Sequence, residues 1–106
     1  MKFNEYQEKA RATAIYPEEF DVVYPLIGLS GEVGELANKI QKQIRDSGNV
    51  DVPQQQIIGE LGDILWYLST LAGDLGVDME DVAKYNLTKL ASRRMRNKLN
   101  GSGDDR

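Results

Sequence analysis

The chain has 106 residues and a net charge of -4, from 13 basic and 17 acidic side chains; this length suits one domain and no more. It contains neither cysteine nor histidine, which excludes a disulfide framework, a Ser-His-Asp triad and a histidine-ligated zinc centre. Any metal must be held by oxygen ligands, which favours magnesium, manganese or calcium. The negative charge argues against a dedicated nucleic-acid binder.

The spacing of apolar residues is helical nearly throughout the chain, and it predicts an all-α fold. Short connections between the helices favour antiparallel packing in a four-helix bundle. The third helix is the most apolar and is expected at the centre of the bundle. Proline and glycine positions help to place the four predicted helices over residues 4–15, 24–45, 53–75 and 79–99.

The predicted second helix carries apolar residues at three- and four-residue steps, which we expect to form its buried face. They are Leu26, Leu29, Val33, Leu36, Ile40 and Ile44. We expect one domain over residues 1–99 and a tail without periodicity over residues 100–106. The longest apolar run, residues 64–68, is far below the ~18 residues of a membrane span, and no signal-peptide pattern opens the chain. These features lead us to expect a soluble cytoplasmic protein.

A hexad of the pattern Gly-Glu-aliphatic-Gly-acid-aliphatic occurs twice, over residues 31–36 and 59–64. Each glycine within a helix costs roughly 1 kcal/mol relative to alanine, so the repeated glycines need a compensating benefit. Because glycine has no side chain, another backbone or a ligand can approach closely. We therefore expect the second and third helices to cross closely at the two hexads, with Gly28 one turn upstream of the first.

The two hexads supply four acids, each pair spaced three residues apart and hence on one face of its helix. They are Glu32, Glu35, Glu60 and Asp63. A single pair of this kind is common on a solvated helix face, but two matched copies flanked by costly glycines favour a binding site. Four converging carboxylates would repel one another in a partly desolvated cleft unless a cation were present. The pattern predicts a Mg²⁺ or Mn²⁺ site.

A second charged segment has the opposite sign, because residues 84–98 contain six bases and no acid. Asn86, Lys89 and Arg93 share one helical face there. Such a face can hold a phosphate chain, although a solvated basic face or an RNA contact is the alternative. Tyr67 and Lys39 each follow an acid of the predicted site by one turn, so both are candidate substrate contacts. The alternative for Tyr67 is ordinary packing, and for Lys39 it is a surface ion pair with Glu35.

The spacing Glu32-x-x-Glu35, 24 intervening residues, and Glu60-x-x-Asp63 resembles the signature of the MazG-like, all-α nucleoside triphosphate pyrophosphohydrolases. The resemblance extends to Phe3-x-x-Tyr6-Gln7, residues 28–36, Asn86-x-x-Lys89-x-x-x-Arg93 and residues 101–106. It implies metal-dependent hydrolysis of a nucleoside triphosphate to the monophosphate and pyrophosphate. It also implies that the four acids are metal ligands and that Asn86, Lys89, Arg93 and Tyr67 contact the nucleotide.

The mechanistic hypothesis is that water activated by the cation attacks a phosphorus atom. Since histidine is absent, a carboxylate must take the proton, and Glu35 is our candidate. The small core and the family resemblance both favour a homodimer or a dimer of dimers. The alternatives are a phosphoribosyl-ATP pyrophosphohydrolase, a non-catalytic dimeric helical interaction module and, least favoured, an RNA-binding protein.

Overall fold

The computed structural model describes residues 1–106 and contains no strand. Its helices are α1 (Phe3–Arg11), a short 3-10 helix (Glu18–Phe20), α2 (Val23–Ser47), α3 (Gln54–Asp74) and α4 (Met79–Met95). The prediction of an all-α chain with four α-helices is confirmed. None of the helices combines the length and the apolar character needed to cross a lipid bilayer.

Two of the helices end earlier than the sequence predicts. Helix α1 ends at Arg11 because Thr13 is held in a turn: its hydroxyl donates to the carbonyl of Ala10 at 2.7 Å and accepts the Trp66 indole N–H at 2.8 Å. Helix α4 ends at Met95, just before Asn97 adopts a positive φ of 56°. Helix α2 runs two residues beyond its predicted end and stops before Gly48, where φ is 70° and the left-handed conformation suits glycine.

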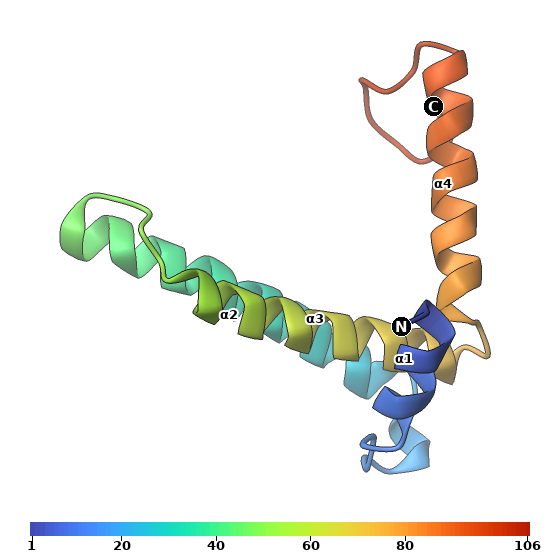
Figure 1. Ribbon diagram of the computed structural model, residues 1–106, viewed down its shortest axis with the longest axis horizontal. Coiled ribbons are helices and arrows are strands. Elements are labelled where there is room, and N and C mark those ends of the chain that lie inside the picture. The colour runs from blue at the N-terminus through green and yellow to red at the C-terminus, as the bar shows by residue number, and fades with distance from the viewer.

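Helices α2 and α3 pack along each other as a long hairpin, and α3 also contacts α1 and α4 (Figure 1). The prediction that the third helix is central is therefore confirmed. The prediction of a bundle-like subunit is wrong for the single chain, because α4 leaves the end of the hairpin and projects away from it (Figure 1). The Cα radius of gyration is 16.8 Å, whereas a compact chain of this length would have about 13 Å.

The open shape leaves the chain with a very small core, since only 8 of 106 residues are buried. The expectation of a buried face on α2 is wrong for half of the stripe in one chain: Leu29, Leu36 and Ile40 are half-buried, whereas Leu26, Val33 and Ile44 are each at least half exposed. They are exposed because α2 packs on a single neighbour, α3, and α4 does not cover it. Burial of the apolar stripe requires a surface that one chain does not supply.

The N-terminal segment is tied to α3 mainly by polar contacts. The buried carboxylate of Asp74 accepts hydrogen bonds from the Tyr16 hydroxyl at 2.6 Å and the Val22 backbone N–H at 2.9 Å, and it pairs with Arg11. The Gln7 amide donates to the carbonyls of Ser69 and Val77. These contacts fix α1 and the start of α2 against the last turns of α3.

Candidate metal centre

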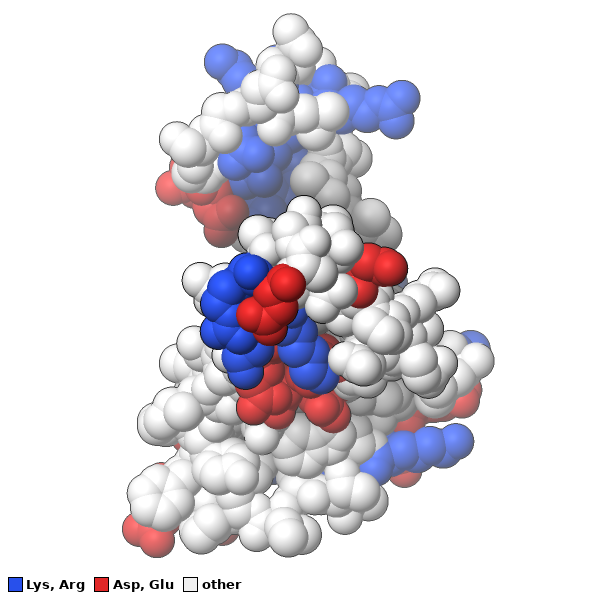
Figure 2. All heavy atoms as spheres, turned by 90° about the vertical axis from the view of Figure 1, so that its left-hand side faces the viewer, with Lys and Arg blue, Asp and Glu red and all other residues white.

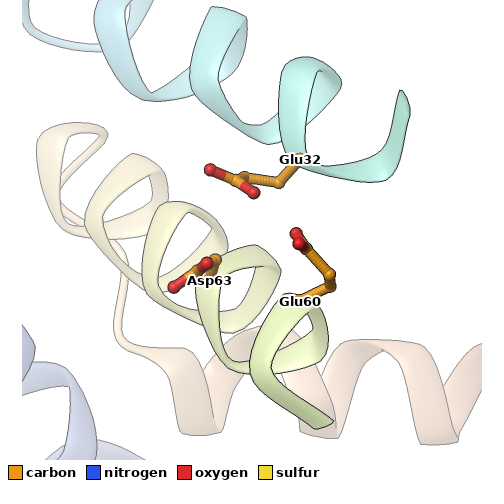
Figure 3. A group of neighbouring side chains, drawn as sticks. All are labelled: Glu32, Glu60 and Asp63. Carbon is orange, nitrogen blue, oxygen red and sulfur yellow. The ribbon is translucent and has the colours of Figure 1, made fainter. Parts of the chain in front are cut away.

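Three of the four predicted acids meet between α2 and α3. Glu32 comes from α2, Glu60 and Asp63 come from α3, and one carboxylate oxygen of each lies within 4.8 Å of the others (Figure 3). Glu60 is buried, Glu32 is half-buried and Asp63 is exposed. We call these three residues the acidic centre; it has a protected interior and an open side.

Two oxygens of the acidic centre lack a hydrogen-bond partner. Oε2 of Glu32 and Oε2 of Glu60 are both buried and unpaired, although buried polar atoms are nearly always satisfied and cost about 1–3 kcal/mol when they are not. A bound cation would satisfy both atoms. The donor set is entirely carboxylate oxygen, which suits a hard ion such as Mg²⁺ or Mn²⁺, so the residues present fit the predicted metal.

The chain itself supplies one positive charge to the acidic centre. Lys39 lies on α2, one turn after Glu35 and two turns after Glu32. Its ammonium donates to Oε1 of Glu60 at 2.7 Å. The hydrogen bond with Lys39 holds the pKa of Glu60 below its usual value. It also raises the pKa of Lys39. The single ammonium contacts only one of the carboxylates.

Glu32 has no cation of its own, and the pKa of its carboxyl is raised to about 7. The main cause is burial, followed by the hydrogen bond that a protonated Glu32 would donate to Glu60 and by repulsion from Glu35 and Asp63. Near neutral pH, a proton on Glu32 therefore reduces the negative charge of the centre. A divalent ion would compete with that proton for the carboxylate.

Glu35, the fourth predicted acid, is not among the three that converge. It is exposed and lines a hollow of about 720 Å³ along α2 together with Gly31 and Gly34. Its charge nevertheless contributes to raising the pKa of Glu32. Glu35 thus lies close enough to the acidic centre for its charge to act on Glu32.

The close approach of the two helices occurs at Gly28 and not at the hexads. A Cβ on Gly28 would overlap the ring of Tyr67, whereas a Cβ on any of the four hexad glycines would meet nothing within 4 Å. The expectation that the hexad glycines allow the close crossing is therefore wrong within one chain. The Gly28 contact lets the Tyr67 ring lie against α2, where burial is the main cause that raises its hydroxyl pKa and the charges of Glu32 and Asp63 add to it.

The predicted substrate residues of α4 are not brought to the acidic centre within one chain. Lys89 and Arg93 belong to the C-terminal half of α4, which extends away from the hairpin (Figure 1). Asn86 lies on the same helix and is exposed. Figure 2 shows the end of the hairpin that lies far from α4, where basic and acidic side chains lie side by side. A separate group of basic side chains lies above it, on the C-terminal part of the chain.

Two residues near these charged groups were not singled out as site residues from the sequence. Tyr6 of α1 has a hydroxyl pKa raised by burial and by the charge of Asp63, which places it near the acidic centre. Asp104 of the tail contacts both Lys89 and Arg93. Both residues lie within segments that carried the family resemblance, but the residue patterns alone gave no reason to assign them a contact.

An all-α hairpin that gathers three carboxylates, with unpaired oxygens in its interior, is an arrangement consistent with a divalent cation between two helices. Residues 26–96 match the MazG nucleotide pyrophosphohydrolase domain, and the chain belongs to this family. It is also 41% identical over 114 residues to the gene 37 protein of Mycobacterium phage L5, with all of both chains covered. No solved structure shows a significant match.

Proposed function

We propose that the protein hydrolyses ribo- or deoxyribonucleoside triphosphates to the nucleoside monophosphate and pyrophosphate, with Mg²⁺ or Mn²⁺ as cofactor. The observation that carries the proposal is the acidic centre, where two buried carboxylate oxygens have no partner. The domain that matches the chain is that of nucleotide pyrophosphohydrolases, which supports the same reaction class.

Glu32, Glu60 and Asp63 are the residues that would hold the cation, and Glu35 is positioned to join them. When bound, the cation neutralises charge on the phosphates and lowers the pKa of water. The protonated fraction of Glu32 near neutral pH must release its proton before both of its oxygens can act as ligands. The buried side of the centre keeps Glu60 fixed, and the open side leaves room for a phosphate chain.

Glu35 is proposed as the group that takes the proton from the attacking water, because the chain has no histidine and Glu35 is exposed beside the acidic centre. A Glu35→Gln variant should keep its fold and lose most of its catalytic rate. A Glu80→Gln variant removes an exposed acid from α4 and serves as the control. Full activity in Glu35→Gln would contradict the assignment.

The proposed substrate contacts are divided between two parts of the chain. Lys39 and Tyr67 lie in the hairpin, whereas Asn86, Lys89 and Arg93 lie on α4, which extends away from α2 (Figure 1). We propose that a second copy of the chain completes the site with residues of its own α4. Apolar side chains that repeat every seven residues support this proposal: Leu61 and Leu68 on α3, and Leu75 directly after it, are 37–61% exposed.

Sedimentation at micromolar concentration tests the assembly, with a homodimer or homotetramer as the expected result. Leu90→Glu places a charge on the apolar side of α4, where Leu90 is 39% exposed, and should weaken the assembly. Thr88→Glu adds the same charge at an exposed position of the same helix and should leave the assembly unchanged. A stable and active monomer would contradict this part of the proposal.

Pyrophosphate release from a panel of ribo- and deoxyribonucleoside triphosphates tests the reaction, with Mg²⁺, with Mn²⁺ and with a chelator. The expected products are pyrophosphate and the monophosphate, formed only with metal. Glu32→Gln should abolish release, and Glu80→Gln should not. Activity on phosphoribosyl-ATP, with none on the nucleoside triphosphates, would identify the protein as a phosphoribosyl-ATP pyrophosphohydrolase. No release, together with no stabilisation by metal, would favour a non-catalytic helical module.

A further inference from the structure

The chain after α4 forms a built loop and not a loose tail. Residues 96–106, here called the C-terminal loop, turn back beside α4 (Figure 1). The Arg106 guanidinium closes the loop by donating to the carbonyls of Lys98 at 3.2 Å, Leu99 at 3.2 Å and Gly103 at 2.8 Å. Gly101 and Gly103 have φ values of 106° and 85°, which glycine adopts without strain.

The C-terminal loop places Asp104 on the two bases that are predicted to bind phosphate. Lys89 Nζ donates to Asp104 Oδ1 at 3.0 Å. Nη2 of Arg93 donates to the backbone carbonyl of Asp104 at 2.6 Å and to Oδ1 at 3.4 Å. These contacts lower the pKa of the Asp104 carboxyl, with Lys89 as the largest cause. An anionic oxygen therefore already occupies the place beside the paired bases.

The same contacts restrict access to the bases. Arg93 is only 5% exposed. Its Nε is buried and has no hydrogen-bond partner. The Asp104 side chain is 82% exposed and is held only by the two bases. Because Arg106 anchors the C-terminal loop through backbone carbonyls, the Asp104 carboxylate can rotate into solvent without unfolding the loop. Rotation of the carboxylate frees Lys89 and the longer contact of Arg93, whereas the bond from Arg93 to the Asp104 backbone carbonyl stays in place.

We propose that Asp104 is an internal competitor for the Lys89 and Arg93 anion site, and that the polyphosphate chain of the substrate binds there by displacing its carboxylate. This inference rests on the proposed function, because it takes the two bases as phosphate contacts. Carboxylate and phosphate oxygens compete for the same charge-assisted hydrogen bonds. A triphosphate carries more charge than one carboxylate and gains the advantage in that exchange.

The test is calorimetric titration of the whole protein with inorganic tripolyphosphate in the presence of a chelator, so that the acidic centre does not contribute. Asp104→Asn should bind tripolyphosphate about fivefold more tightly, because it removes one charge about 4 Å from the ligand in a solvated setting. Asp105→Asn removes the neighbouring exposed charge and should change the affinity less than twofold. Unchanged affinity in Asp104→Asn would overturn the proposal, and weaker binding would show that Asp104 orients the bases.

A second variant covers the case in which Asp104→Asn is poorly folded, which circular dichroism would show. Arg106→Ala releases the anchor of the C-terminal loop and should also tighten tripolyphosphate binding; equal or weaker binding would count against the proposal. Lys89→Met should lose binding and remove most of the gain from Asp104→Asn. If Lys89→Met binds as the wild type does, the two bases are not the anion site and the inference fails.

Hydrolysis measured on the same samples separates this inference from the proposed function. Pyrophosphate release by the wild type, with unchanged tripolyphosphate affinity in Asp104→Asn, overturns only the competitor role. Tighter binding in Asp104→Asn without hydrolysis of any nucleotide supports the competitor role and counts against the enzyme.

Discussion

The acidic centre and the C-terminal loop are two charged regions that differ in whether their charges have counter-ions within the chain. In the acidic centre, three carboxylates have one ammonium among them, and two buried oxygens lack a partner. At the C-terminal loop, Lys89 and Arg93 of α4 share the carboxylate of Asp104, which the same chain supplies. The acids are short of positive charge, whereas the bases already have an anion.

The difference follows from how each region is built. Two long helices hold the acids at fixed positions, so the acids cannot move apart to relieve their repulsion. The bases lie on an exposed helix followed by eleven residues, 96–106, that can fold back and cover them. The site between the two helices thus remains open to a ligand, whereas a loop that folds back beside its helix can supply the counter-ion of the bases. The following changes test this contrast, from the largest expected effect to the smallest.

Glu32→Gln should have the largest effect on the acidic centre. It keeps the shape of the side chain and removes a ligand charge, so we expect hydrolysis to fall at least about a hundredfold. Tripolyphosphate binding in a chelator should be unchanged, because the basic pair is untouched. Pyrophosphate release and calorimetry measure the two effects; loss of both in a folded variant would show that the regions are not separate.

Gly28→Ala should disturb the acidic centre through packing. The new Cβ would overlap the Tyr67 ring, and such overpacking costs about 1–3 kcal/mol. Gly34→Ala is the matched control, because nothing lies within 4 Å of a Cβ there. It should change the free energy of unfolding by less than about 1 kcal/mol. Urea denaturation compares the two variants, and equal stabilities would show that the ring moves aside without cost.

The stability of the metal-free protein should fall as pH rises from about 4.5 to about 7. The pKa of Glu32 rises from 4.5 to about 7 on folding, so the folded state holds a proton in this range that the unfolded state has lost. Glu60, Asp74 and Asp104 have lowered pKa values. These three carboxylates stabilise the fold when they are ionised. Their contribution is lost as pH falls into the acidic range, which is the opposite direction to that of Glu32.

Thermal unfolding with a chelator at pH 5.5 and pH 7.5 measures this effect. Adding Mg²⁺ at pH 7.5 should restore stability by mass action. The Glu32→Gln variant should lose the difference between the two pH values. A wild type that is more stable at pH 7.5 than at pH 5.5 without metal would contradict the expected sign.

Lys39→Met should have the smallest effect and should strengthen metal binding by several-fold. The Lys39 ammonium occupies Oε1 of Glu60 at 2.7 Å, so it competes with a cation and repels it. Titration with Mn²⁺ at pH 7.5 measures the affinity, and Lys42→Met serves as the control on the same helix. Weaker binding in Lys39→Met would mean that the ammonium helps to arrange the ligands.

The helices and the acid pairs follow from the local sequence. Helical spacing predicted four α-helices, and proline or glycine marked ends such as Gly48. The spacing of Glu60 and Asp63 placed both on one face of a helix, and they do converge with Glu32. These features depend on backbone periodicity, which extends over only a few residues.

The contacts of Glu35, Gly28 and Asp104 could not be predicted in the same way. Whether Glu35 joins the other acids depends on how α2 turns against α3, and in this structure Glu35 is exposed and does not converge with them. Gly28 takes the close contact in place of the hexad glycines because Tyr67 reaches it from α3. Asp104 meets Lys89 only because the C-terminal loop reverses direction.

The sequence by itself determined the helical class, the charge of each region and the absence of histidine and cysteine, because these depend on residue type and short-range spacing. The tertiary structure decided which acids meet, where α4 projects and which anion covers the bases. These outcomes depend on helix crossing and on the path of a loop, where contacts between residues distant in the chain fix the geometry.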